Sequence, residues 1–106
     1  MYNFNIITRK TQEEIDNALE QNKHLMIIYI ARWSDRSYYL FNTLKDTYKD
    51  VYKTIYVDAD ESLELMENMD VYRVPTVQFY NNKKLVTTLK DNITKEEIIE
   101  AVSNRA

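Results

Sequence analysis

Two serines separated by two residues, in the stretch Trp33-Ser34-Asp35-Arg36-Ser37, are the side chains of this sequence best placed to do chemistry. A serine becomes a hydrolytic nucleophile only when a base lies within hydrogen-bond reach and an acid orients that base. The single histidine, His24, falls at the far end of a predicted strand, roughly 20 Å from Ser34 at about 3.3 Å per residue. This distance argues against a Ser-His pair. It favours Ser34 as a helix N-cap and Ser37 as a small polar residue of the first helical turn.

Composition limits the other kinds of chemistry. The chain has no cysteine and one histidine, so structural disulfides are excluded and we expect no metal site and no cofactor. The acidic run 58–61 follows a strand and precedes a helix, where the helix dipole alone favours carboxylates. The chain also lacks glycine, so asparagine is expected to take left-handed backbone positions, with Asn81-Asn82 the first candidates.

Length and charge indicate one small domain. The 106 residues are 44% hydrophobic and contain no linker-like segment, so we expect a single domain over residues 1–106. The net charge of -3 is spread without a long run of one sign, which argues against nucleic acid as a partner. No apolar run approaches the roughly 20 residues of a membrane span, and the first residues lack the layout of a secretion signal. We therefore expect a cytoplasmic monomer that does not bind membranes.

Hydrophobic periodicity predicts alternating strands and helices. Strands are expected at residues 3–8, 25–31, 54–58, 76–80 and 84–89, the last two forming an antiparallel hairpin around 81–83. Helices are expected after the capping boxes at Thr11 and Thr94, over 61–69, and from Ser34 or Asp35 to about residue 50. Their predicted apolar faces carry Ile15, Ala18 and Leu19; Leu40, Phe41, Leu44, Tyr48 and Val51; Leu65, Met66 and Met69; and Ile98, Ile99 and Val102. The order βαβαβαββα predicts an α/β fold with a central mixed five-stranded sheet flanked by four helices.

An ordered set of motifs extends over nearly the whole chain: the apolar strand ending in Ala31-Arg32-Trp33, the serine pair opening a helix, the run 57–60, Val74-Pro75-Thr76, and the final hairpin and helix. In this order of motifs the chain resembles the thioredoxin family. The resemblance implies the thioredoxin fold, with a cis Val74–Pro75 peptide bond beside Ser34 and Ser37. It also implies a groove that binds an extended protein segment, formed by Trp33, Asp35, Arg36, Val74, Pro75 and Thr76. Tyr38 and Tyr39 either extend an aromatic rim with Trp33 or pack locally.

Replacements at five positions separate the sequence from a working thioredoxin. Ser34 and Ser37 stand where the family has its attacking and resolving cysteines, and Asp35-Arg36 replaces the usual Gly-Pro between them. Ile28 occupies the place of a buried aspartate that helps to move a proton in thioredoxins proper. Because disulfide exchange requires a thiolate, the chain as written cannot cycle a disulfide through positions 34 and 37.

The expected rim of the groove is more charged than in the family. Arg73 and Asp91 stand where glycines are usual. Arg36 lies in a first helical turn, where the helix dipole disfavours a cation. A partner carboxylate or phosphate that pairs with Arg36 would explain a positive charge at this position. Partner choice is therefore expected to differ from that of thioredoxins.

Three hypotheses follow. The first is a naturally redox-inactive binding module that uses the groove at Trp33 and Pro75 without covalent chemistry. The second is a thiol-disulfide oxidoreductase whose Cys-Asp-Arg-Cys motif has been changed to Ser-Asp-Arg-Ser. The third, a structural subunit of a larger assembly, follows only from the fold, and fold alone does not establish function.

Overall fold

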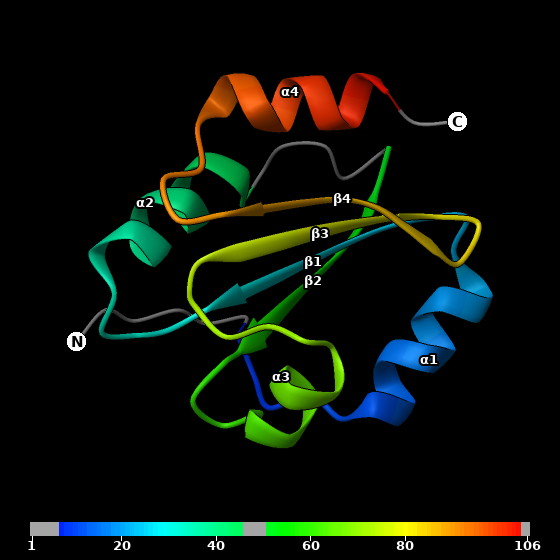
Figure 1. The fold of residues 1–106 in the computed structure, drawn as a ribbon, viewed down its shortest axis with the longest axis horizontal. Coiled ribbons are helices and arrows are strands. Elements are labelled where there is room, and N and C mark those ends of the chain that lie inside the picture. The colour runs from blue at the N-terminus through cyan, green and yellow to red at the C-terminus, as the bar shows by residue number, and fades with distance from the viewer. Residues whose placement is uncertain (1–6, 46–50, 105–106) are drawn as a thin grey trace.

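The structure is a computed structural model, and it describes residues 7–45 and 51–104. Four strands and four helices alternate along this part of the chain (Figure 1). In order they are α1 (Gln12–Gln21), β1 (His24–Ile30), α2 (Asp35–Leu44), β2 (Lys53–Asp58), α3 (Leu63–Asn68), β3 (Thr76–Asn81), β4 (Lys84–Lys90) and α4 (Lys95–Ser103). Both predicted capping boxes are present, at Thr11 with Glu14 and at Thr94 with Glu97.

The sheet is mixed and has the strand order β2-β1-β3-β4. Strand β1 pairs in parallel with β2 and antiparallel with β3, and β3 forms the predicted antiparallel hairpin with β4. Helices α2 and α4 cover one face of the sheet, and α1 and α3 cover the other (Figure 1). The three layers confirm the predicted α/β architecture, and they place the start of α2 and the start of α4 on the same side of the sheet.

Three details of the sequence prediction differ from the structure. The sheet has four strands among the described residues rather than five, because Thr8 forms only an isolated parallel bridge to Val57 and residues 3–6 lie outside the described part. Helix α2 ends at Leu44, residues 46–50 also lie outside, and Val51 is a turn residue packed against the core rather than a helical one. Ile99 is 44% exposed. The buried stripe of α4 runs through Ile98, Ala101 and Val102, and Ile99 lies beside this stripe rather than on it.

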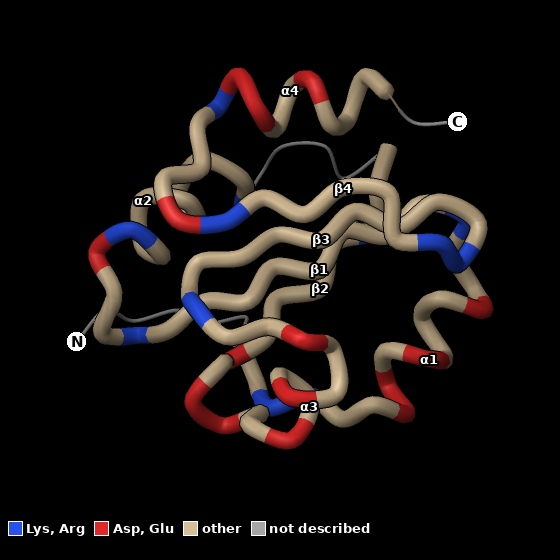
Figure 2. The backbone as a smooth tube through the Cα atoms, in the orientation of Figure 1, with Lys and Arg blue, Asp and Glu red and all other residues tan. Residues whose placement is uncertain are grey.

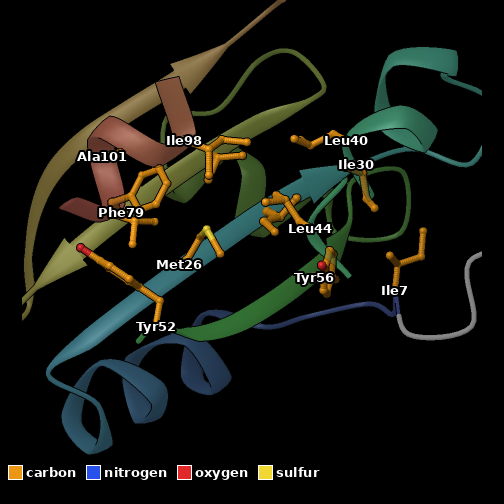
Figure 3. Close-up of a cluster of buried hydrophobic side chains, with 13 residues drawn as sticks. Ile7, Met26, Ile30, Leu40, Leu44, Tyr52, Tyr56, Phe79, Ile98 and Ala101 are labelled. Atoms are coloured by element: carbon orange, nitrogen blue, oxygen red, sulfur yellow. The ribbon is translucent and has the colours of Figure 1, made fainter. Parts of the chain in front are cut away.

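The larger core lies between the sheet and helices α2 and α4 (Figure 3). Strand β1 contributes Met26, Ile28 and Ile30, all fully buried, as expected for a central strand covered on both faces. Figure 3 shows Phe79 of β3 and Ile98 of α4 reaching toward the same space. Because Ile28 belongs to this apolar cluster, the position offers no group that could carry a proton.

The second core lies between the sheet and helices α1 and α3. It holds Ile15 of α1, Leu65 of α3 and the opposite face of β1. One buried polar contact crosses it, from the Tyr29 hydroxyl to the Gln78 side-chain oxygen at 2.8 Å. Burial, and to a smaller extent the nearby Tyr80, raises the pKa of the Tyr29 hydroxyl above its ordinary value. Tyr29 therefore stays neutral in the folded protein well into the alkaline range.

Non-glycine residues take the left-handed backbone positions. Asn82 and Lys83 form the hairpin turn with φ of 51° and 71°, whereas Asn81 remains in β3, so the prediction for Asn81-Asn82 holds for Asn82 only. Asp91 has φ of 70° and Asp70 has φ of 60°. Asp70 follows α3 in a Schellman arrangement, since its N–H donates to Glu67 and the next N–H donates to Met66. Within residues 7–45 and 51–104, no helix is both long and apolar enough to cross a membrane.

Candidate functional site

The serine pair closes the turn between β1 and α2. Ser34 is the N-cap of α2, and its hydroxyl accepts from the backbone N–H of Ser37 at 3.2 Å. The Ser37 hydroxyl accepts in turn from the backbone N–H of Ala31 at 3.2 Å. Ser37 and Ala31 are fully buried, and Ser34 is 8% exposed. Both hydroxyls therefore satisfy backbone donors at the strand-to-helix junction, as the N-cap interpretation predicts for Ser34.

The single histidine lies away from these serines. His24 begins β1, whereas Ser34 follows its other end. Its Nδ1 lies 2.9 Å from the Asn81 side-chain oxygen, and its ring lies against Tyr52 with centroids 5.3 Å apart. The structure therefore leaves Ser34 without a histidine base.

Trp33 and the acidic run 58–61 lie beside the serine turn. Trp33 is 61% exposed, and its indole N–H donates to the Asp60 carboxylate at 2.9 Å. The buried Asp58 carboxylate lies 3.4 Å from Nε of Arg32. The Nη2 group of the same guanidinium donates to the carbonyl of Ile7. In the part of the chain that the structure describes, no three His, Asp or Glu side chains gather as metal ligands would.

The segment Val74-Pro75-Thr76 enters β3 through a cis peptide bond between Val74 and Pro75. Pro75 is buried, and the Val74 side chain packs against the second core. The Thr76 hydroxyl donates to the carbonyl of Arg73 at 2.7 Å, which closes the loop before the strand. The loop is therefore fixed at both ends, by packing at Val74 and by a hydrogen bond at Thr76.

An ion pair joins this loop to the segment after β4. The Arg73 guanidinium lies 2.7 Å from the Asp91 carboxylate, and both side chains are at least half exposed. The sequence predicts a charged rim from these two residues, but it does not predict that they pair. Nearby, the exposed Tyr72 hydroxyl donates a hydrogen bond to the Asp70 carboxylate, which raises the pKa of Tyr72.

One cavity brings the start of α2 and Pro75 together. It has a volume of about 190 Å³. The described residues that line it are Arg36, Tyr39, Leu40, Thr43, Pro75, Asp91, Asn92, Ile93, Thr94, Lys95 and Ile98. We call this cavity the Pro75 groove. Three elements therefore form it: the first turns of α2, the loop of Pro75, and the segment from Asp91 into α4.

The groove contains only part of the predicted set of site residues. Arg36 and Pro75 line it, and Tyr39, 71% exposed, lines it without the Trp33 side chain that the aromatic-rim alternative requires. Tyr38 instead packs against the larger core. The other predicted residues, Trp33, Ser34, Asp35, Ser37, Val74 and Thr76, are not among the lining residues. A larger cavity of about 590 Å³ lies along β2 and is lined by none of the predicted site residues.

The remaining lining residues were not predicted as site residues. The sequence pattern places Leu40 and Ile98 only in the core, and it indicates no site at Thr43, Asn92, Ile93, Thr94 or Lys95. One sequence signal points to residues 92–95, because the segment 91–95 links the hairpin to a helix that must return over the sheet. No local pattern, however, places that segment beside residue 36.

Comparison with known proteins identifies the family. The thioredoxin family model matches residues 6–104, and the chain therefore belongs to the thioredoxin family. Comparison with curated proteins gave no match.

Solved thioredoxin structures share the fold. Mitochondrial thioredoxin 3 of Saccharomyces cerevisiae, in the oxidized form, is 20% identical with a TM-score of 0.81, over 92% of this chain and 94% of that one. Plasmodium falciparum thioredoxin is 24% identical with a TM-score of 0.76, over 90% and 94%. Fasciola hepatica thioredoxin is 16% identical with a TM-score of 0.80, over 89% and 93%. The predicted thioredoxin fold is therefore confirmed.

Proposed function

We propose that this member of the thioredoxin family is a redox-inactive binding module that holds an extended protein segment in the Pro75 groove. The observation that carries the proposal is that Pro75 and the first turns of α2 line one cavity. Its volume of about 190 Å³ is below the roughly 300–1,000 Å³ of pockets that enclose small-molecule ligands. A space of this size suits one or two side chains of a longer chain that continues over the surface.

The lining of the groove supports a peptide occupant. Leu40, Ile98 and Pro75 are buried and give it an apolar floor. Arg36, Thr43 and Asn92 are exposed and give it polar groups at the rim. An apolar floor with a polar rim is the usual layout of a protein interaction site.

The absence of thiols supports binding without covalent chemistry. The chain has no cysteine, and the hydroxyls of Ser34 and Ser37 already accept backbone hydrogen bonds. A sulfur is only a weak acceptor, so cysteines would satisfy these backbone donors poorly. Serine is therefore well suited to the structural role at both positions.

A second candidate, a parent thiol-disulfide oxidoreductase with cysteines at both positions, is favoured by one observation. Both positions are buried, but Ser34 is 8% exposed and Ser37 is 0% exposed, so a cysteine at position 34 would be the less buried of the two and the one that a partner disulfide would reach first. Reading the natural codons for positions 34 and 37 separates the two candidates, because serine codons would remove the second.

Peptide selection tests the proposed groove. A phage library of random twelve-residue peptides is selected on the immobilised full chain, and one enriched peptide is titrated into ¹⁵N-labelled protein. We expect chemical-shift changes at Arg36, Tyr39 and residues 91–95, which line the groove. Changes confined to other surfaces, or no enriched peptide, would contradict the proposal.

A blocking variant with a matched control completes the test. Thr43 is an exposed residue of α2 at the groove, so Thr43→Phe should fill the space and abolish peptide binding. Thr88 is an exposed threonine opposite Gln78, on the face of the sheet that α1 and α3 cover. Thr88→Phe should leave binding unchanged.

A further inference from the structure

We infer that the Pro75 groove selects extended segments in which an acidic side chain lies two positions from an apolar one. This inference rests on the proposed function and adds the chemistry of the partner. It follows from the charges that line the groove, the free or paired state of each, and the geometry of an extended chain.

Two cations line the groove without a salt bridge. Arg36 lies in the first turn of α2, and Lys95 is the first residue of α4. Within residues 7–45 and 51–104, neither forms a salt bridge, and both side chains are exposed. Each is placed where the helix dipole disfavours a positive charge, so neither position is explained by helix stability.

The acidic residue of the lining is already neutralised. Asp91 pairs with Arg73 at 2.7 Å, which leaves Arg36 and Lys95 as uncompensated charges in the lining. Helix α4 also carries Glu96 and Glu97, but neither lines the groove, and Glu97 accepts from the backbone of Thr94 in the capping box. The groove therefore presents a local positive charge on a chain whose net charge is -3.

Charge over the rest of the surface favours the same choice. Acidic residues lie on α1 and α3, on the face of the sheet opposite α2 and α4, and also along α4 itself after Lys95 (Figure 2). An acidic segment would be repelled from these surfaces and attracted to the two cations of the groove, because complementary potentials steer association and suppress wrong orientations. A basic segment would meet Arg36 and Lys95 at the groove and be disfavoured there.

An extended segment can place one side chain on the apolar floor and another beside a cation. Leu40, Ile98 and Pro75 accept an apolar side chain, whereas Arg36 and Lys95 stand at the rim. In an extended chain, side chains at i and i+2 point to the same side and are roughly 7 Å apart. A segment with an apolar residue and an Asp or Glu two positions away can therefore fill the floor and meet a cation together.

The test uses the peptides selected on the full chain. Selected sequences should be enriched in an apolar residue with Asp or Glu at i+2 or i-2. One enriched peptide and its Asn or Gln counterpart are then compared by fluorescence anisotropy. We expect the amide peptide to bind about fivefold more weakly, and the difference to shrink when salt is raised from about 0.05 to 0.5 M.

Protein variants assign the effect to the two cations. Arg36→Gln and Lys95→Gln should each weaken binding of the acidic peptide about fivefold. Each should change binding of the amide peptide little. The matched control is Arg9→Gln, since Arg9 is an exposed arginine in the hollow between α1 and α3. It should leave both peptides unaffected, and the thermal midpoints of all three variants should not fall.

The possible failures are distinguishable. Peptides that lose binding in Thr43→Phe, yet show no acidic enrichment and no response to Arg36→Gln, would overturn this inference and leave the proposed function standing. Peptides that bind Thr43→Phe normally, or a selection that yields none, would overturn both.

Discussion

Replacing Ser37 by alanine removes one hydrogen-bond acceptor at the junction of β1 and α2 without adding atoms. The Ser37 hydroxyl accepts from the N–H of Ala31 at 3.2 Å, and both residues are fully buried. The variant therefore leaves the Ala31 N–H without its acceptor in a place that water does not reach.

The size of the effect follows from two opposing terms. A buried donor left without a partner costs about 1–3 kcal/mol. Alanine is a better helix former than serine by at most about 0.7 kcal/mol, which offsets part of this cost. We expect Ser37→Ala to lower the free energy of unfolding by about 1–2 kcal/mol, which corresponds to a fall of roughly 4–10 °C in Tm for a domain of this size.

Urea unfolding followed by circular dichroism measures the difference, and a second serine provides the control. Ser103 is an exposed residue of α4, so Ser103→Ala should change stability by less than about 0.5 kcal/mol. If Ser37→Ala were as stable as the parent while Ser103→Ala behaved as expected, the hydrogen bond to Ala31 would contribute nothing. The structural explanation of Ser37 would then be wrong.

Three further predictions concern chemistry, pH and the backbone. The Ser34→Cys/Ser37→Cys double variant should reduce insulin disulfides at a rate at least about tenfold below that of a working thioredoxin, because the buried Ile28 cannot carry a proton. An equal rate would argue against a lineage without redox function. Burial raises the pKa of Tyr29 above 10.0, so above about pH 10 the unfolded chain ionises first and stability falls by up to about 1.4 kcal/mol per pH unit. Urea titrations between pH 9 and 11 should show a shallower fall for Tyr29→Phe, and parallel slopes would refute the assignment. Asp70→Gly should raise the free energy of unfolding by about 0.5–1 kcal/mol, since Asp70 has φ of 60°, and a loss of stability in thermal unfolding would show that its backbone is not strained.

Local signals predicted the elements well. The two capping boxes, the central strand β1 and the N-cap at Ser34 each depend on residues within a few positions of one another. The same locality explains the error at Ile99. The buried stripe runs through Ile98, Ala101 and Val102 and leaves Ile99 at its edge, and the local pattern does not say which of the two isoleucines faces the sheet.

The groove depends on contacts that local signals do not contain. Arg36 and Lys95 are far apart in sequence and line one cavity only because α2 and α4 lie on the same face of the sheet. The pairing of Arg73 with Asp91 likewise depends on the register of β3 with β4, in which Thr76 lies opposite Lys90. The family resemblance indicates the place of the groove and the charges of Arg36 and Asp91, but the contribution of Lys95 required the structure.

Under the proposed function, serine in place of cysteine changes which residue of the segment 34–37 would face a partner. In a dithiol enzyme the reactive atoms belong to the first and last positions, because sulfur attacks sulfur. Here both terminal hydroxyls bind backbone N–H groups, and of the four residues only Arg36 lines the groove. Arg36 stands where the family usually has proline, and an exposed arginine opposed to the helix dipole gains nothing from the fold itself. If the proposed function holds, serines at 34 and 37 together with a cation at the groove replace covalent attack on a partner by electrostatic selection of it.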